Sequence, residues 1–273
     1  MPNVQVIDRK RHTGKRWQRY TSYLHTAADA VAHLVMPELP RACVAMPIGF
    51  VEVKGGLAPV AIQGLEPGRN EFVAADGRWL ADYVPAAYRS YPFVLGTTES
   101  GRPVLCMIEG SGLVSDTRGE PFFGEQGEPA PVMTQILDFL IQMAGQRRVT
   151  QRVCKVLREY GLFQPWPFTR STEAGEETIL GLHRIDTAAL GRLPPEAFEE
   201  IRRAGALPMI YCHLLSMQHL AKLKRLSQDR AATQGGGPSA VSGELDLEFL
   251  NHDGTVGFGA LNPPLMQSRE VRP

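Results

Sequence analysis

The pattern of apolar and polar residues changes character at Pro129, where short apolar runs give way to spacings of three and four. Before this point, the runs at residues 45–53 and 57–62 flank a turn at Lys54–Gly56. The runs at 93–98 and 103–109 flank a second turn, which also contains glycine. Because glycine supplies the positive φ that a tight turn requires, these runs predict two β-hairpins.

Three further elements are expected in the N-terminal half. Val4–Ile7 and Glu71–Ala74 are apolar enough to form short strands, and the second of these is closed by a turn at Ala75–Gly77. A short helix is expected over Thr26–Leu34.

Helical patterning dominates after Pro129. Apolar residues recur every three or four positions from Val132 to Tyr160, which predicts one amphipathic helix or two joined near Gly145, ended by Gly161. Further elements are then expected, namely strands at Trp166–Thr169 and Thr178–Ile185, a short helix capped by Asp186, a helix between Pro194 and Gly205, and a helix at Leu207–Leu226. The chain is therefore expected to be α+β, with a mostly antiparallel sheet of β-hairpins in the N-terminal half packed by helices from the C-terminal half.

The composition divides the chain into three parts. Residues 1–227 are expected to form one α+β domain, and residues 228–243 a flexible linker rich in Gly, Pro and Ser. Residues 244–273 form an acidic-aromatic tail with a possible hairpin at Asp253–Gly254. Two interpretations of the tail stay open, because it could dock on its own domain or offer a short linear motif to a partner.

The run RWLADYVPAAYRSYPF, residues 78–93, concentrates aromatic side chains. Tyr and Trp combine a large apolar ring with a hydrogen-bond donor, so the rings suit a pocket that stacks on a peptide, sugar or indole-like ligand. The alternative is that they fill the interface between sheet and helices, and Trp166 invites the same two interpretations. The ligand-binding candidates here are Arg78, Trp79, Tyr83, Tyr88, Tyr91 and Trp166.

These residues also carry a resemblance to a known family. Over about residues 4–227 the chain resembles the SapC family. The matching landmarks are AMPIGFV (45–51), DGRWL (76–80), YVPAAYRSYPF (83–93), SGLVSD (111–116), GLFQPWPF (161–168), GLHRID (181–186) and GALPMIYCHLLSMQHL (205–220).

The resemblance implies a role without implying a catalytic residue. The family takes its name from genes associated with bacterial surface layers. Similar proteins occur beside TonB-dependent receptors, tryptophan-halogenase-like flavoproteins and cupin-like oxygenases. The resemblance therefore implies a helper in an uptake or surface-modification system.

Composition and charge exclude several classes. The formal net charge is zero, which argues against nucleic acid as a partner. The local basic cluster at residues 9–19 is expected to be a solvated arm, with contact to phosphate or to an acidic partner as the weaker alternative. The four cysteines lack metal or redox spacing and are expected to be buried free thiols in a reducing compartment. No signal peptide or membrane-spanning segment is evident, so a cytoplasmic location is expected.

Motifs for catalysis, metals and cofactors are weak. The His25/His33 and His213/His219 pairs do not have the spacing of a metal site, and neither a metal nor a cofactor is predicted. The loop GSGLVSDTRG, with Ser111 and Asp116 as candidates, could clasp an anion or substrate through its backbone, or be a simple connection.

Two functional hypotheses remain at this point. The first is an accessory or binding protein that holds a protein or peptide partner, with a small-molecule ligand also possible. The second is an enzyme, a metal-dependent oxygenase or peptide-modifying activity acting with flavoprotein and cupin-like partners. In it, His183, His213, His219 or Asp116 would converge.

Overall fold

The computed structural model describes residues 3–172, 175–233 and 255–257. The chain divides into two compact units, each built from segments that are distant in sequence. The first unit comprises residues 1–17, 92–141 and 254–273, and the second comprises residues 18–91 and 142–253. Antiparallel sheets and helices in the C-terminal half confirm the α+β prediction.

The first unit contains two small sheets. One has the strand order β1-β7-β6-β14 and the other the order β8-β2-β9. The strands are β1 (Val4–Val6), β2 (Arg16–Trp17), β6 (Phe93–Thr97), β7 (Pro103–Ile108), β8 (Val114–Ser115), β9 (Glu120–Pro121) and β14 (Thr255–Gly257), and a short helix is α1 (Arg9–His12). The predicted strand near Val4 and the hairpin of β6 and β7 are both confirmed.

Aromatic rings form the core of the first unit. Trp17 meets Phe93 edge to face at 4.8 Å between ring centroids, and Phe93 meets Phe122 at 6.3 Å. Val132 and Met133, from the first turn of α4 (Pro131–Glu159), are buried against them.

The second unit is built on a five-stranded antiparallel sheet in the order β10-β13-β4-β5-β3. Its strands are β3 (Val31–His33), β4 (Ile48–Val53), β5 (Gly56–Ile62), β10 (Phe163–Pro165) and β13 (Leu182–Ile185), with a separate hairpin of β11 (Phe168–Thr172) and β12 (Gly175–Ile179). Its helices are α2 (Leu39–Ala42), α3 (Ala86–Arg89), α5 (Thr187–Gly191), α6 (Pro195–Arg203), α7 (Leu207–Ser216) and α8 (Leu220–Thr233), and its 3₁₀ turns are η1 (Leu24–Thr26), η2 (Met36–Glu38) and η3 (Met217–His219). The predicted hairpin of β4 and β5 is confirmed.

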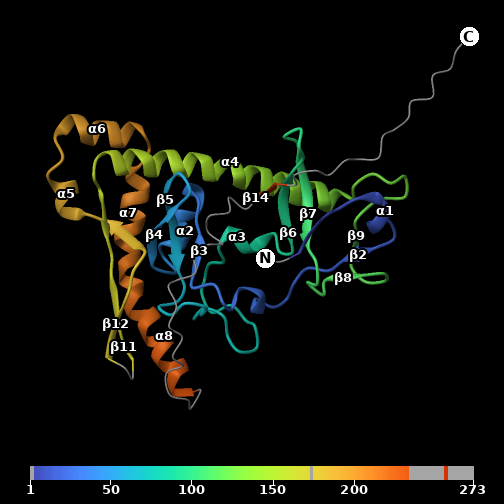
Figure 1. Ribbon diagram of the computed structural model, residues 1–273, viewed down its shortest axis with the longest axis horizontal. Coiled ribbons are helices and arrows are strands. Elements are labelled where there is room, and N and C mark those ends of the chain that lie inside the picture. The colour runs from blue at the N-terminus through green and yellow to red at the C-terminus, as the bar shows by residue number, and fades with distance from the viewer. Residues whose placement is uncertain (1–2, 173–174, 234–254, 258–273) are drawn as a thin grey trace, which may run out of the picture. The chain divides into compact units, whose positions relative to one another are not determined.

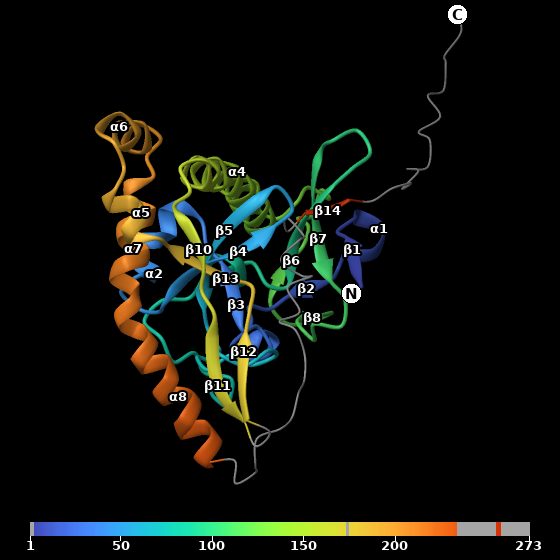
Figure 2. The same ribbon diagram turned by 60° about the vertical axis from the view of Figure 1, so that its left-hand side comes forward.

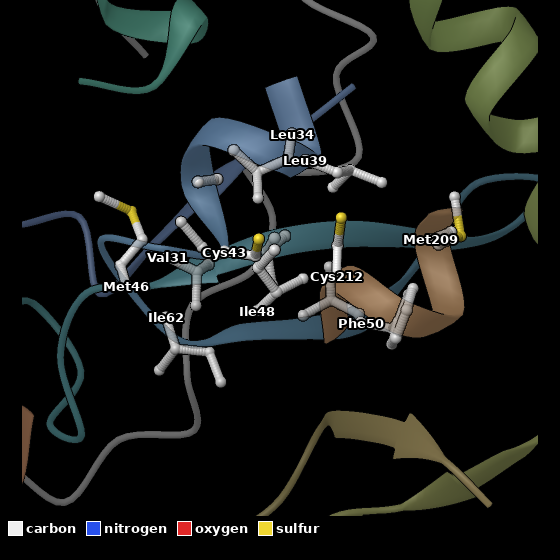
Figure 3. Packing of buried hydrophobic residues seen from close by; sticks show 14 of the residues in the cluster. Val31, Leu34, Leu39, Cys43, Met46, Ile48, Phe50, Ile62, Met209 and Cys212 are labelled. Atoms are coloured by element: carbon white, nitrogen blue, oxygen red, sulfur yellow. The ribbon is translucent and has the colours of Figure 1, made fainter. Parts of the chain in front are cut away.

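The core of the second unit lies between its sheet and α2 and α7. Figure 3 shows Leu39 and Cys43 of the α2 region, Met209 and Cys212 of α7, and Ile48 of β4 packed together. All four cysteines are free and buried, as the sequence predicts.

Helix α4 contributes its first residues to the first unit and residues 142–159 to the second. It is a single helix, not two, and Gly161 ends it as predicted. With φ of 64°, Gly161 donates its N–H to Arg158, and Leu162 donates to Leu157 at 3.0 Å. This is a Schellman cap, which satisfies carbonyls that the helix end leaves open.

Two predictions in the N-terminal half are wrong. Residues 26–34 form the end of η1 and the strand β3 instead of a helix, because β3 pairs with β5 in the sheet. Glu71–Ala74 makes only an isolated bridge between Val73 and Trp79, since the Asn70 side chain accepts from the Phe72 N–H at 3.0 Å. Long-range pairing in the first case and a side-chain turn bond in the second override the local pattern.

In the C-terminal half the elements are confirmed with changed boundaries. The helices capped by Asp186 and opened by Pro195 are present. Four strands, β10 to β13, are found over residues 163–185, where two were expected. The single helix expected over Leu207–Leu226 is divided by η3 into α7 and α8 (Figure 2). Just before η3, Ser216 donates to the carbonyl of His213 at 2.6 Å and accepts from the Ile48 N–H, a back-bond that bends helices.

The boundaries of the expected linker and tail are described only in part. Helix α8 runs to Thr233, into the range assigned to the linker by composition, and the rest of that range lies outside the described residues. In the tail, the turn at Asp253–Gly254 also lies outside them, while β14 pairs in parallel with β6 from Thr255↔Leu95 to Gly257↔Thr97. Among the residues that the structure describes, no helix is both long and apolar enough to cross a membrane.

Candidate functional site

The first half of the aromatic run is fixed by a buried carboxylate. Glu38, at the end of η2, is 5% exposed and accepts three hydrogen bonds. They come from the Tyr83 hydroxyl (2.8 Å), the Ala86 N–H (2.7 Å) and the Val35 N–H (3.0 Å). A buried carboxylate with three donors is well satisfied, so Glu38 ties this part of the run to the core.

A hydrogen bond also joins Trp79 to Tyr83. The indole N–H of Trp79 donates to the Tyr83 carbonyl at 2.8 Å, and the Tyr83 ring is buried. Burial and the nearby Glu38 carboxylate raise the pKa of Tyr83, so its hydroxyl keeps its proton. The polar atoms of these two side chains are therefore occupied within the protein.

The arginines and Trp166 also have partners within the chain. Arg78 is exposed and pairs with Asp76 at 2.6 Å, while Arg89 donates to the Val84 carbonyl and lies 5.1 Å above the Tyr83 ring. Trp166 is buried and meets Phe168 and His213 at centroid distances of 4.5 and 6.0 Å.

Trp79 and the second half of the run join a cluster of rings, which we call the aromatic cluster: Tyr20, Tyr23, His25, Trp79, Tyr88 and Tyr91. His25 and Tyr91 stack almost in parallel, at 3.8 Å and 11°. Tyr20 meets both of these rings edge-on, at 5.0 and 6.0 Å. Tyr20, Tyr23, His25 and Tyr91 are half-buried, so this end of the cluster reaches the surface.

Gly77 lets the segment that carries Tyr23 lie close to the segment that carries Trp79. Its φ of 85° is in the left-handed region, and a Cβ at this position would lie 2.0 Å from the Ser22 hydroxyl oxygen. Its carbonyl accepts from the Tyr23 N–H at 2.8 Å. Only glycine fits this close approach, which places Trp79 against the Tyr23 ring at 5.3 Å.

A layer of buried polar side chains lies beneath Tyr88. The Tyr88 hydroxyl donates to the Gln63 Oε1 at 2.6 Å, and Asn70 donates to the same oxygen at 3.2 Å. Tyr88 also interacts with the Asp29 carboxyl group, and burial raises the pKa of Asp29 to about 6. Burial likewise raises the pKa of Tyr20 to about 12, with the neighbouring Tyr23 as a further cause.

Two buried nitrogens of this region have no hydrogen-bond partner: His25 Nε2 and Gln63 Nε2. His25 Nδ1 lies 3.2 Å from the Ser22 carbonyl, which can only accept, so this nitrogen carries the ring hydrogen. Burial lowers the pKa of His25, which favours the neutral ring. The His25 Nε2 lone pair is therefore an unsatisfied acceptor, and such groups are uncommon in folded proteins.

Ser111 and Asp116 belong to the first unit. Ser111 lines a pocket of about 400 Å³, while Asp116 pairs with Lys15, another residue of that pocket, at 2.5 Å. These two candidates therefore belong to a different unit from the aromatic run. They lie near part of the basic cluster at residues 9–19.

Two of the three histidines named in the enzyme hypothesis, His213 and His219, have contacts with the backbone of other segments. His213 is buried between the Ile48 carbonyl (2.9 Å) and the Ile185 N–H (3.2 Å), and burial lowers its pKa to about 4. His219 contacts the Cys43 carbonyl at 3.1 Å, and the buried Nδ1 of His183 has no hydrogen-bond partner. Within the described part of the chain, no three His, Cys, Asp or Glu side chains are grouped so that they could hold a metal ion.

Sequence reasoning missed half of the aromatic cluster and all of its polar layer. Tyr20, Tyr23 and His25 occur in the segment RYTSYLHT, whose aromatic density was the available signal. Asp29, Gln63 and Asn70 carry no local motif, because they meet only through the fold.

Comparison with known proteins gives one match. The SapC family model covers residues 7–223, which includes the aromatic run, the loop with Ser111 and most of the helical region. No curated protein and no solved structure matches the chain. Because the match extends over well more than half of its length, the chain belongs to the SapC family.

Proposed function

We propose that this SapC-family chain is a binding protein that holds an aromatic-containing peptide segment of a partner on its aromatic cluster. The observation that carries the proposal is the stacked pair of His25 and Tyr91, half-buried and with the His25 Nε2 acceptor unsatisfied. In the other half of the run, Trp79 and Tyr83 have their polar groups bonded within the chain.

The chemistry of the cluster favours a peptide over a charged ligand. The half-buried rings of Tyr20, Tyr23 and Tyr91 offer apolar faces and hydroxyl groups next to one another. Aromatic pairs contribute about 0.5–1.5 kcal/mol beyond the area that they bury.

Selection of peptides on the purified protein tests this proposal. A random peptide library displayed on phage would be selected on the whole chain, and the enriched peptides measured by fluorescence anisotropy. We expect enrichment of aromatic residues, and a loss of affinity of about tenfold in Tyr91→Ala, which corresponds to about 1.4 kcal/mol.

Tyr211→Ala is the matched control, because Tyr211 is a tyrosine of the same unit that is 53% exposed and does not belong to the aromatic cluster. It should bind the selected peptides like the unaltered chain. Equal binding by Tyr91→Ala, or no enrichment at all, would contradict the proposal.

The cellular role is part of the same proposal. We place the chain in the cytoplasm, as an accessory protein of a surface-layer or TonB-linked uptake system, and SapC membership is the support for the accessory role alone. Fractionation of the native host would find it in the soluble fraction. Recovery mainly with the cell envelope would contradict the cytoplasmic placement.

A further inference from the structure

A pocket of about 400 Å³ opens on the first unit, where the ends of β1 and β7 meet the glycine-rich loop 110–113. The residues that carry the argument are Gln5, Arg11, Lys15, Met107, Glu109 and Ser111. Its volume is at the lower end of the range for pockets that take small molecules. None of these residues belongs to the second unit, which carries the aromatic cluster.

One wall of the pocket is set by the register of two strands. Gln5 of β1 lies directly opposite Met107 of β7, so both side chains are on the same face of the sheet. Met107 is buried, and Val114 at the start of β8 adds a second apolar group to the lining. The pocket thus has an apolar part beside polar groups.

Positive charge comes from helix α1 and the residues after it. Arg11 is exposed, and Lys15 is half-buried and paired with Asp116 at 2.5 Å. Because Asp116 already balances Lys15, Arg11 is the cation with more capacity for a carboxylate. Its guanidinium group suits bidentate binding of that group.

Negative charge comes from Glu109, which follows β7. Asn3 donates to one carboxylate oxygen of Glu109, and the Gln5 amide, with its nitrogen toward the other oxygen, reaches that oxygen at 3.3 Å. In this orientation the Gln5 oxygen accepts from Arg11. Gln5 therefore lies between a cation and an anion.

Ser111 adds a donor. Its hydroxyl oxygen accepts from the Leu113 N–H at 3.4 Å, which leaves the hydroxyl hydrogen for another acceptor. The pocket consequently presents two kinds of group, namely donors for a carboxylate and an acceptor for an ammonium.

We propose that this pocket binds a zwitterion of dipeptide size, with the ligand carboxylate on Arg11 and Ser111 and its ammonium group on Glu109. Phosphate or another simple anion would be repelled by Glu109 and would leave the apolar part unused. A free dipeptide satisfies both charges, and a side chain of moderate size contacts Met107 and Val114.

Calorimetric titration of the whole chain with alanyl-leucine tests the proposal, with N-acetyl-alanyl-leucine, alanyl-leucine amide and inorganic phosphate as comparison probes. We expect alanyl-leucine to bind at least tenfold more tightly than each of the other three. Arg11→Gln should weaken alanyl-leucine binding about tenfold, since a hydrogen bond to a charged group is lost.

Two further variants separate the roles of the charges. Glu109→Gln should bring alanyl-leucine down to the affinity of the acetylated form, while the acetylated form itself binds this variant no more weakly than it binds the unaltered chain. Lys10→Gln is the control, because Lys10 is an exposed cation of the same helix that does not line the pocket. It should bind like the unaltered chain.

Failure of alanyl-leucine to bind at millimolar concentration would overturn the proposal, as would equal binding of the acetylated dipeptide or of phosphate. Tyr91→Ala should leave this titration unchanged. The two sites are therefore tested independently.

Discussion

The two ends of the aromatic run use similar side chains in opposite ways. At one end, Tyr83 is buried and its hydroxyl is held by Glu38, which also accepts from two backbone N–H groups. At the other end, Tyr91 is half-buried and stacks on His25, whose Nε2 acceptor has no partner. The difference teaches that hydrogen-bond satisfaction, more than aromatic content, separates framework from candidate site.

Two carboxyl groups that interact with tyrosines of the run, one buried and one half-buried, show the same contrast. Glu38 has three donors, while Asp29 interacts with Tyr88 and has its pKa raised to about 6 by burial. Glu38 thus stabilises the fold through its hydrogen bonds. Asp29 destabilises it at neutral pH, where its charge must be kept in a desolvated position.

The largest expected effect is that of Glu38→Ala, which leaves the Tyr83 hydroxyl and the N–H groups of Val35 and Ala86 without their acceptor. We expect a loss of about 3–5 kcal/mol in the free energy of unfolding, measured by urea denaturation, because buried donors would be unsatisfied.

Glu38→Gln is the companion variant. Its amide oxygen can still accept, so its loss should be clearly smaller. A loss below about 1 kcal/mol in Glu38→Ala would remove the distinction between the two ends of the run.

An intermediate effect is expected from Asp29→Asn, and its sign depends on pH. The pKa of Asp29 is raised in the folded protein from 3.8 to about 6, so the folded state holds the proton more tightly than the unfolded state. The stability linked to this proton is fully present below pH 3.8 and is lost as the pH rises through 6.

Removing the charge should therefore stabilise the protein by about 3 kcal/mol at pH 7.5 and have little effect at pH 4. Urea denaturation of both proteins at the two pH values measures this. The pKa of His213 is lowered to about 4, so the folding stability linked to this group is lost in the opposite direction, as the pH falls from 6.5 to 4. Because this loss occurs in both proteins, the difference isolates Asp29, and equal stabilisation at both pH values would refute its assignment.

The smallest effect is the difference between two hydroxyl deletions. Tyr83→Phe removes a hydrogen bond to the buried Glu38 carboxylate and should cost about 1.5 kcal/mol in unfolding free energy. Tyr91→Phe alters a half-exposed ring and should stay within about 0.5 kcal/mol of the unaltered chain. The same denaturation assay decides between them, and losses of equal size would show that Tyr91 is also framework.

Local signals were sufficient where a backbone conformation or a cap is fixed by nearby residues. Gly161 ends α4, Asp186 caps α5 through the Ala189 N–H at 2.9 Å, and the hairpin of β4 and β5 closes at its glycine turn. Each depends on residues only a few positions apart, so the pattern contained the information.

The remainder depends on contacts between distant segments. Residues 31–33 become β3 because β5 pairs with them, and Tyr88 meets Gln63 across twenty-five positions. The run itself was found from its composition, as were Trp79 and Tyr91 within it. The contacts of Trp79 and Tyr91 with Tyr20, Tyr23 and His25 could not be predicted from the sequence, because no spacing rule links residues that meet only after folding.

The nested order of segments has a consequence for how the chain folds. Strand β1 at the N-terminus pairs with β7, as in Val4↔Ile108, and the segment 18–91 of the second unit lies between them in sequence. Closing so long a loop is entropically unfavourable until the intervening residues are ordered. The second unit is therefore expected to order residues 18–91 first, and during synthesis the N-terminal strand waits for a partner that leaves the ribosome about a hundred residues later.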